Sequence, residues 1–220
     1  FINMDSRFTI LYRQSQGQWK VVHIHHSLPN AEQMEGEFYP KTLATQVQQA
    51  QNEADQMRVL AQRDGLTGLY NYRALEKQWG QWNAPGLWFF LLDIDDFKQV
   101  NDSRGHIEGD ALLREIGIIL RDNCRATDVA SRMGGDEFVL LLPDIEDDEA
   151  VEQACERILG EIRRPFPLDE NVTVHLTASI GVSLFPRDSQ DEDSLLTGAD
   201  QAMYRIKRGS KDHYSYTRTP

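Results

Sequence analysis

The amino-acid sequence predicts an α+β fold, an α/β sandwich in which helices cover a central sheet, over residues 64–220. Two observations lead to this fold class. Segments with the period of a helix alternate with segments of strand length, and one pair of strand-like segments forms an internal hairpin. Apolar residues make up 40% of the chain, which suffices for a packed core.

The first forty residues contain two strand-like runs. These are Arg7–Arg13 and Gln18–His25, and the turn-forming residues 14–17 between them predict a hairpin. The region resembles the closing strands of a SnoaL-like (nuclear-transport-factor-2-like) domain. The resemblance implies that residues 1–40 are the C-terminal remnant of an upstream β-rich domain. Because the chain starts at Phe1, we expect it to be a piece of a longer protein.

Three histidines, His23, His25 and His26, lie on the second of these runs, and His23 and His25 share one face of it. A metal site needs a third ligand nearby, and none is evident in the sequence. We therefore interpret these residues as structural or surface histidines.

Residues 41–63 have the periodicity of one uninterrupted helix. Apolar residues recur at alternating spacings of four and three, at Leu43, Val47, Ala50, Ala54, Met57 and Ala61. This is the a/d rhythm of a coiled coil, and its alanine-rich seam predicts weak pairing. Two interpretations remain open: a coiled-coil linker through which two chains pair, or one surface helix packed on its own domain.

Residues 64–220 contain the elements of the sandwich. In order, we predict a helix near 72–82, a strand at 87–94, a helix at 109–123, strands near 128–133 and 137–142, a helix at 147–163, a strand at 172–185, a helix at 193–207 and a strand at 212–217. The strand at 87–94 is apolar almost to its end, which is typical of a buried strand. The hairpin turns at Gly134-Gly135.

The charge and hydropathy of the chain exclude several function classes. The net charge is −12, so no overall field favours nucleic acid or an anionic membrane. Any phosphate ligand must be bound by a local cluster of cations, backbone N–H groups or metal. No apolar run reaches the roughly 18 residues of a membrane span. Cys124 and Cys155 lack metal-ligand spacing, and we expect reduced thiols in a cytoplasmic protein.

A cluster of carboxylates ends the apolar strand. Asp93, Asp95 and Asp96 lie within four residues, and Lys98 follows them. Carboxylates this close repel one another unless a cation lies between them, and hard oxygen ligands suit Mg²⁺ or Mn²⁺. Taken alone, such a segment is more often an ordinary acidic loop.

Two further carboxylates, Asp136 and Glu137, follow Gly134 and Gly135. The glycines allow a tight hairpin turn and a close approach of a nucleotide to the backbone. Taken alone, this turn is also more often an ordinary one. Two adjacent strands would, however, place both sets of acids at the same edge of the sheet, which is how a two-metal site for phosphoryl transfer is built.

The segment Gly134-Gly135-Asp136-Glu137-Phe138 is identical to the signature of GGDEF-type diguanylate cyclases, and residues 60–216 resemble that family. Further motifs follow in the family's order: Asp64–Asn71, Asp93–Asp102, Gly105-His106, Gly109-Asp110, Ser179–Val182 and Ala199–Tyr204. The resemblance implies a mostly antiparallel central sheet flanked by helices, like the palm domain of nucleotidyl cyclases and polymerases. It divides the chain into the remnant 1–40, a signalling linker helix at 41–63 and a cyclase domain at 64–220.

The resemblance also implies roles for individual acids. Asp93, the backbone carbonyl of Ile94 and Asp136 would hold Mg²⁺ or Mn²⁺, two ions per active site. Glu137 would support the metal shell. Asp136 would activate the attacking 3′-hydroxyl, either as a general base or through metal-assisted deprotonation.

The same resemblance assigns the two parts of the nucleotide. Asn101 and Asp110, with His106 close by, would read the guanine edge. A carboxylate accepts hydrogen bonds from guanine N1–H and N2–H₂, whereas adenine has no such donor pair. The triphosphate would be held by Lys98, Lys207, Lys211 and backbone N–H groups near Phe97.

Three positions depart from the family's pattern. Tyr72 stands where the opening motif commonly has arginine. In the later Lys-x-x-Gly-Arg-Asn pattern the glycine comes one position early, at Gly209, and Lys211 replaces the arginine. Lysine keeps the charge but loses the bidentate geometry of guanidinium. We therefore expect weaker GTP binding without loss of activity.

The resemblance implies condensation of two GTP into cyclic di-GMP and two pyrophosphates. Each domain supplies half of a site, so the active species would be a homodimer paired through residues 41–63. Arg125 and Asp128 have the Arg-x-x-Asp spacing of the family's inhibitory site, which implies product feedback. Two alternatives remain open: a catalytically weak or inactive module that binds GTP or cyclic di-GMP, and a ferredoxin-like structural domain without a ligand.

Overall fold

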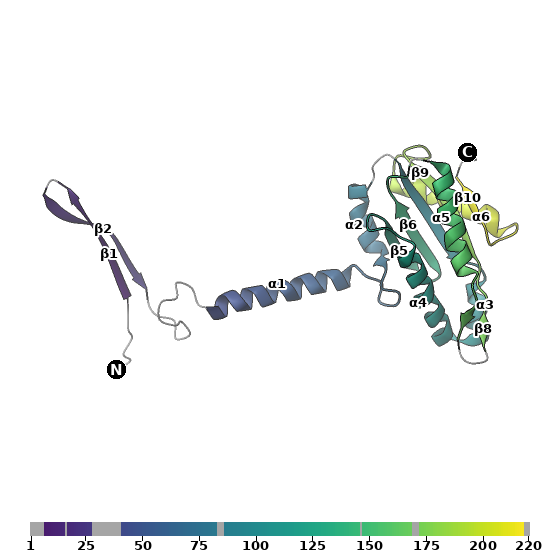
Figure 1. Ribbon diagram of the computed structural model, residues 1–220, viewed down its shortest axis with the longest axis horizontal. Helices are drawn as coiled ribbons and strands as arrows, with labels where there is room; N and C mark the ends of the chain where they lie inside the picture. The colour runs from purple at the N-terminus through teal and green to yellow at the C-terminus, as the bar shows by residue number, and fades with distance from the viewer. Residues whose placement is uncertain are drawn as a thin grey trace. The chain divides into compact units, whose positions relative to one another are not determined.

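The computed structural model describes residues 7–15, 17–27, 41–82, 86–145, 147–168 and 172–217. The chain divides into two compact units, one ending at Arg58 and the other beginning at Val59. Helix α1 (Lys41–Ala61) crosses this boundary and ends two residues before the predicted limit (Figure 1). None of the described helices is long and apolar enough to cross a membrane.

The first unit contains an antiparallel hairpin of β1 (Arg7–Ser15) and β2 (Gln18–Ser27), as the sequence predicts. Its register places Ile10 opposite Ile24, and both side chains are exposed. The hairpin therefore presents apolar side chains that the described residues of its own unit leave uncovered.

The histidines of β2 are surface residues wherever their side chains are described. His23 and His25 are exposed, opposite Leu11 and Thr9 of β1. The side chain of His26 lies outside the described residues. In helix α1 the seam residue Met57 is 70% exposed, so its apolar side chain is available for contact.

The second unit is built on a six-stranded sheet with the order β10-β9-β4-β6-β5-β3. The strands are β3 (Tyr70–Asn71), β4 (Leu87–Ile94), β5 (Val129–Gly134), β6 (Glu137–Leu142), β9 (Ala178–Phe185) and β10 (Tyr214–Tyr216). β4 is antiparallel to β6 and β9, and β5 is antiparallel to β6. Only the short edge strands β3 and β10 pair in parallel. The predicted mostly antiparallel sheet is thereby confirmed.

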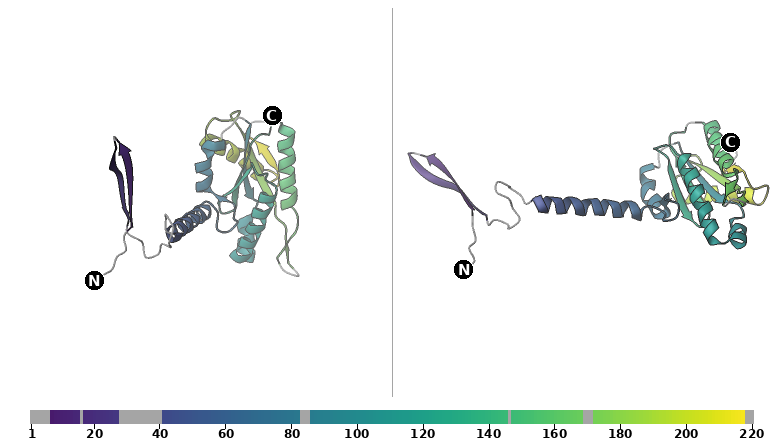
Figure 2. Two further views of the ribbon diagram at one scale, coloured as in Figure 1. Left: turned by 60° about the vertical axis from the view of Figure 1, so that its left-hand side comes forward. Right: turned by 60° about the horizontal axis from the view of Figure 1, so that its bottom comes forward.

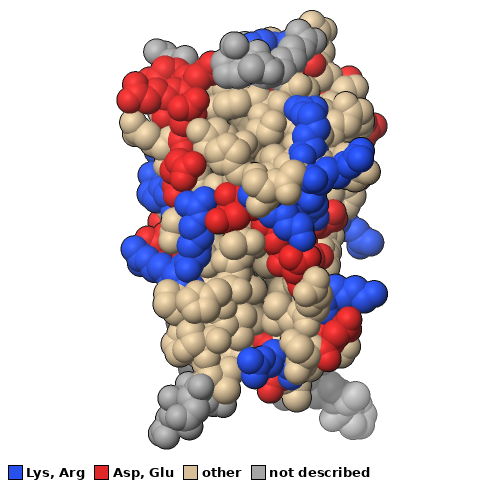
Figure 3. Space-filling model, turned by 90° about the vertical axis from the view of Figure 1, so that its right-hand side faces the viewer, with Lys and Arg blue, Asp and Glu red and all other residues tan. Residues whose placement is uncertain are grey.

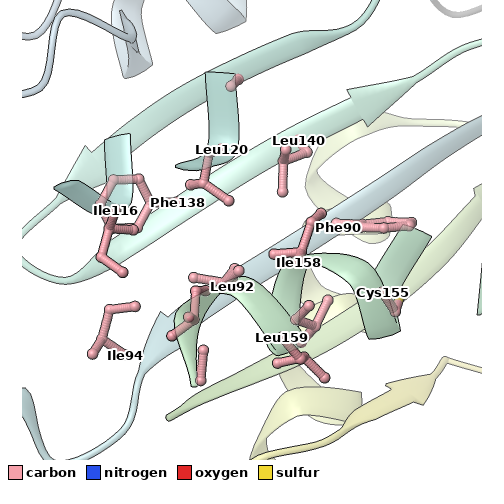
Figure 4. Close-up of a cluster of buried hydrophobic side chains, with 14 of the residues drawn as sticks. Phe90, Leu92, Ile94, Ile116, Leu120, Phe138, Leu140, Cys155, Ile158 and Leu159 are labelled. Atoms are coloured by element: carbon pink, nitrogen blue, oxygen red, sulfur yellow. The ribbon is translucent and has the colours of Figure 1, made fainter. Parts of the chain in front are cut away.

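Helices cover both faces of this sheet (Figure 1, Figure 2). They are α2 (Tyr72–Trp82), α3 (Phe97–Arg104), α4 (His106–Asp122), α5 (Asp148–Ile162) and α6 (Glu192–Lys207). One face packs against α4 and α5. Phe90 and Leu92 of β4 lie there in a cluster with Ile116 of α4 and Ile158 of α5 (Figure 4).

The opposite face of the sheet packs against α2 and α6. Phe89 and Leu91 of β4 lie there in a second cluster with Leu75 of α2 and Met203 of α6. Because side chains of a strand alternate between faces, both clusters draw on the same strand. This is why all eight residues of β4 are buried, and why the strand is apolar almost to its end.

The structure corrects two predicted elements. The helix predicted at 109–123 begins at His106, and a separate helix α3 precedes it, because Gly105 adopts a φ of 95° between them. The strand predicted at 172–185 is two strands. β8 (Thr173–Val174) pairs with β7 (Phe166–Pro167) in a small separate sheet, whereas β9 pairs with β4. All other predicted elements lie within two residues of their expected bounds.

Candidate functional site

Two acidic strand ends meet at one edge of the sheet. Asp93, near the end of β4, lies directly opposite Glu137 at the start of β6. The backbone N–H of Ile94 donates to the carbonyl of Asp136 at 3.3 Å. Gly135, in the turn between β5 and β6, has a φ of 58°, a conformation that glycine adopts without strain. The structure thus brings together the acids that the sequence predicts to be neighbours.

Asp93 is held in an unfavourable electrostatic position. Burial, together with the nearby charges of Asp136 and Glu137, raises the pKa of its carboxyl to about 6. The ammonium of Lys207 opposes this shift from 2.5 Å away. An excess of negative charge therefore remains at this edge of the sheet.

The donors at this edge suit a divalent cation. The carboxylates of Asp93 and Asp136 and the carbonyl of Ile94 are hard oxygen ligands, which Mg²⁺ and Mn²⁺ prefer. A cation would also offset the cost of burying the Asp93 carboxylate and its repulsion from Asp136 and Glu137. Within the described ranges, no three acidic, cysteine or histidine side chains form a ready-made metal cluster. The donor chemistry fits the ion, with a backbone carbonyl among the donors.

A pocket of about 350 Å³ opens beside these acids. Its lining includes all the residues predicted to read guanine, Asn101, His106 and Asp110. Asn101 comes from α3 and the other two come from α4. The two helices approach closely at Gly109, where any side chain would collide with Oδ1 of Asn101.

The predicted phosphate-binding residues divide between the pocket and the acidic edge. Phe97 and Lys98 line the pocket at the start of α3. Lys207 contacts Asp93, whereas the ammonium of Lys211 lies 2.7 Å from both carboxylate oxygens of Asp96. The structure therefore gathers all three predicted lysines around the acids and the pocket.

Arg132 supports the turn between β5 and β6, a role that sequence reasoning missed. Its Nε and one terminal nitrogen donate to the carbonyl of Gly135 at 3.0 and 2.6 Å. The other terminal nitrogen donates to Asp64 at 3.2 Å. Burial raises the pKa of Asp64, but hydrogen bonds from Thr67 and Arg132 outweigh this effect and lower it overall.

Arg125 and Asp128 lie at a second, smaller pocket of about 90 Å³. They form a tight turn in which the backbone N–H of Arg125 donates to the Asp128 carboxylate at 2.7 Å. Arg157 of α5 also lines this pocket, and its Nε donates to Asn123 at 2.7 Å. Sequence reasoning missed Arg157, since no local motif marks it. The pocket thus contains two guanidinium groups and one carboxylate.

Charges of both signs are interspersed on one face of the molecule. Figure 3 shows acidic and basic side chains next to one another across the middle of one face. Phosphate groups would therefore be bound by local clusters of cations, backbone N–H groups or metal, as the net charge of −12 implies.

Comparison with known proteins extends the resemblance over most of the chain. Residues 61–213 match the family described as "Diguanylate cyclase, GGDEF domain". The chain is 37% identical over 180 residues to the bifunctional diguanylate cyclase/cyclic di-GMP phosphodiesterase MucR of Pseudomonas aeruginosa, covering 79% of this chain and 26% of MucR. It is 32% identical over 211 residues to the probable diguanylate cyclase DgcE of Escherichia coli, covering 92% of this chain and 19% of DgcE.

A solved structure agrees with the fold. The coiled coil and GGDEF domain of DgcB from Caulobacter crescentus, in complex with c-di-GMP, is 27% identical with a TM-score of 0.72. The match covers 80% of this chain and 96% of that one. The chain spans only about a quarter or less of the length of MucR and DgcE.

Proposed function

The chain belongs to the family of GGDEF diguanylate cyclases, and we propose that it condenses two GTP into cyclic di-GMP and two pyrophosphates. The observation that carries this proposal is the meeting of two acidic strand ends beside a pocket lined by Asn101 and Asp110. In each half-reaction the 3′-oxygen of one GTP bonds to the α-phosphorus of the other. The bond from that phosphorus to pyrophosphate breaks, and the hydroxyl proton leaves.

The acidic edge supplies the metal ligands and the proton acceptor. Asp93, the Ile94 carbonyl and Asp136 would hold two Mg²⁺ or Mn²⁺ ions, and Glu137 would support them. Such ions, when bound, acidify the hydroxyl and neutralise charge on the phosphates. Asp136 takes the hydroxyl proton as a general base or supports its metal-assisted loss. The rigid sheet keeps these groups at one edge.

The pocket supplies recognition of the nucleotide. Asp110 accepts from the guanine N–H edge, Asn101 hydrogen-bonds beside it, and His106 lies at the rim. Lys98, Lys207 and Lys211, with N–H groups near Phe97, neutralise the triphosphate. Lysine in place of arginine at 211 lowers the affinity for GTP, because an ammonium cannot pair with two phosphate oxygens in a fixed plane.

One domain provides half of the reaction centre, so the proposal requires a homodimer. Helix α1 offers the contact, because its seam residues Val47 and Met57 are exposed and recur at coiled-coil spacing. The solved structure of DgcB with its coiled coil supports this proposal. Specific activity should then rise with protein concentration until the dimer is saturated.

The second pocket is the proposed site of product feedback. Arg125 and Arg157 can each donate paired hydrogen bonds to guanine O6 and N7, and Asp128 can accept from a guanine N–H edge. The site shares no lining residue with the substrate pocket. Inhibition there would be allosteric, since it involves two sites and two states of the enzyme.

One observation favours a second candidate, a weak or inactive module that binds GTP or cyclic di-GMP. Two of the acids already form ion pairs with lysines: Lys207 contacts Asp93, and Lys211 contacts Asp96. Their ammonium groups compete with a metal ion for the same oxygens. The cyclase remains our first candidate because Asp93, Asp136 and Glu137 are all present.

The decisive experiment is to incubate the purified chain with GTP and MgCl₂ and to measure cyclic di-GMP. We expect product from the wild type and none from Asp136→Asn, which removes a metal ligand and any base. Asp144→Asn is the matched control, because Asp144 is an exposed aspartate in another turn. GTP binding without any product in the wild type would instead establish the binding module.

A further inference from the structure

The loop that follows α6, residues 208–212, has an unusual backbone. Lys211 and Asp212 both have a φ of 51°, in the left-handed region that L-residues rarely adopt. Gly209 lies nearby but does not occupy either left-handed position. Two consecutive residues of this kind persist only where surrounding contacts enforce the conformation. Here those contacts converge on Asp212.

Every polar group of Asp212 has a partner. Its backbone N–H donates to Oδ2 of Asp95 at 3.1 Å. Its carboxylate oxygens accept from Nε of Arg163 at 2.9 and 3.0 Å. Its carbonyl accepts from a terminal nitrogen of Arg163 at 3.1 Å. The loop is therefore clamped from two sides at a single residue.

Both partners of Asp212 are themselves anchored. Asp95 is 6% exposed and also accepts from the hydroxyls of Thr177 and Ser179, each at 2.8 Å. Arg163 is the C-cap residue of α5, directly after Ile162. The clamp thus joins the loop to the ends of β4 and β9 on one side and to α5 on the other.

The clamp determines where Lys211 points. The backbone angles at Lys211 and Asp212 set the direction in which the lysine side chain leaves the loop, and its ammonium reaches Asp96 beside the metal acids. We propose that Arg163, acting through Asp212, is a positioning residue that directs Lys211 toward the phosphates of GTP. This inference rests on the proposed function, and it gives a role to a side chain that touches no part of the site itself.

The test compares Arg163→Gln with Arg164→Gln. Arg164 is the next residue, its side chain is 70% exposed, and its ion pair is with Glu161. We expect Arg163→Gln to raise KM for GTP at least fivefold with kcat within twofold of wild type, because a phosphate contact acts on substrate and transition state alike. Arg164→Gln should change neither.

Two further variants separate positioning from general damage. Asp212→Asn should raise KM as Arg163→Gln does, and the double variant should be no worse than either single one, because the two residues act through one contact. Arg163→Lys keeps a charge and should recover part of the affinity. Strictly multiplicative effects in the double variant would overturn the inference.

A readout without turnover keeps the inference distinct from the proposed function. Amide hydrogen exchange of residues 209–213 in the nucleotide-free chain should become at least tenfold faster in Arg163→Gln and stay unchanged in Arg164→Gln. Unchanged exchange, or an unchanged KM, would overturn the clamp. If the wild type makes no cyclic di-GMP, the proposed function fails, and the dissociation constant of GTP replaces KM in the same comparison. A wild-type chain that binds no GTP would overturn both.

Discussion

Gly109 sets the position of Asn101, the amide predicted to read guanine. The two helices meet so closely there that any side chain at 109 would collide with Oδ1 of Asn101. We expect Gly109→Ala to displace the amide and to raise KM for GTP about tenfold. This corresponds to about 1.4 kcal/mol, the size of one or two lost hydrogen bonds. Steady-state kinetics with GTP measures the change.

The matched control for this variant is Gly160→Ala in α5. Gly160 is also a helical glycine, but a Cβ there would meet no atom within 4 Å. Alanine should leave KM unchanged and stabilise the fold by about 0.5–1 kcal/mol, because it has the higher helix propensity. Equal KM values for the two variants would contradict the assignment of Asn101 to guanine.

The buried acid Asp93 gives the metal-free chain a pH-dependent stability. Burial raises the pKa of Asp93 to about 6, above its unfolded value of about 4. Protonation therefore stabilises the folded state. This contribution is fully present below pH of about 4 and is lost as the pH rises through about 6.

We therefore expect the Asp93→Asn variant to become more stable relative to the wild type as the pH rises. With a chelator present, the difference in the free energy of unfolding should change by roughly 2–3 kcal/mol between pH 4 and 7, because a tenfold difference in proton affinity between the folded and unfolded states corresponds to about 1.4 kcal/mol. Urea unfolding of both proteins at several pH values measures it. A difference that stays constant with pH would show that Asp93 is not destabilised by its surroundings.

Sequence motifs predicted the acids that meet at one edge of the sheet, but not the residues that support them. Asp93 and Asp136 could be found because each ends or follows a recognisable strand. Arg132 and Asp64 are separated by 68 residues, and only the folded sheet brings them together. Arg157 could not be predicted for a similar reason. It lies on α5, and the sequence pattern of a helix indicates which face is buried but not which distant residues share a pocket with it.

Between elements, Arg132 joins the turn of β5 and β6 to the turn at residues 64–67. Its guanidinium donates to Gly135 and to Asp64 at once, and a single lysine ammonium cannot reproduce this planar geometry. We expect Arg132→Lys to lower the free energy of unfolding by about 1–3 kcal/mol. It should also reduce kcat at least tenfold, because Asp136 lies in the supported turn.

Arg121→Lys provides the comparison for this change. Arg121 is 61% exposed and its ion pair is with the adjacent Asp122, so the replacement should alter neither stability nor kcat. Denaturant unfolding and product formation are measured on all three proteins. Wild-type kcat in Arg132→Lys would show that Asp136 needs no support from this arginine.

The elements themselves were largely predictable, and the exceptions have physical reasons. β4 was found because a strand buried on both faces must be apolar. Helix α3 was missed because Phe97 is its only buried residue, so the segment lacks the periodicity of a helix. The strand at 172–185 was predicted as continuous because its composition does not reveal that β8 and β9 belong to different sheets.

At the scale of the whole molecule, the two pockets should be coupled by feedback. We expect Arg125→Ala to weaken inhibition by added cyclic di-GMP at least tenfold while the initial velocity stays near that of the wild type, because the pocket of Arg125 shares no lining residue with the pocket beside Asp136. Arg157→Ala should act in the same direction, since it removes the second guanidinium group. Initial rates at increasing cyclic di-GMP give the inhibition constants.

Arg114→Ala serves as the control, because it removes an exposed arginine of α4 outside both pockets. It should be inhibited as strongly as the wild type. If Arg125→Ala is also inhibited as strongly, the Arg-x-x-Asp spacing marks a structural turn and no product site.

The fold class of residues 64–220 followed from the sequence. The helix-strand alternation and the internal hairpin sufficed for a sandwich. The limits 1–40, 41–63 and 64–220 remain predictions, and residues 28–40 lie outside the described part of the chain.

The different anchoring of the acids and the lysines has a consequence on warming. Asp93 lies near the end of a strand whose eight residues are all buried, so it can move only when the sheet unfolds. Lys211 depends on a surface loop that hydrogen bonds hold in a strained conformation. On heating, such a loop loosens at a lower temperature than the one at which the sheet unfolds. The rate at saturating GTP should therefore persist up to the melting temperature. The GTP concentration needed for half-maximal rate should rise at temperatures well below the melting temperature. Heat would first make the protein less responsive to scarce GTP and only later inactivate it.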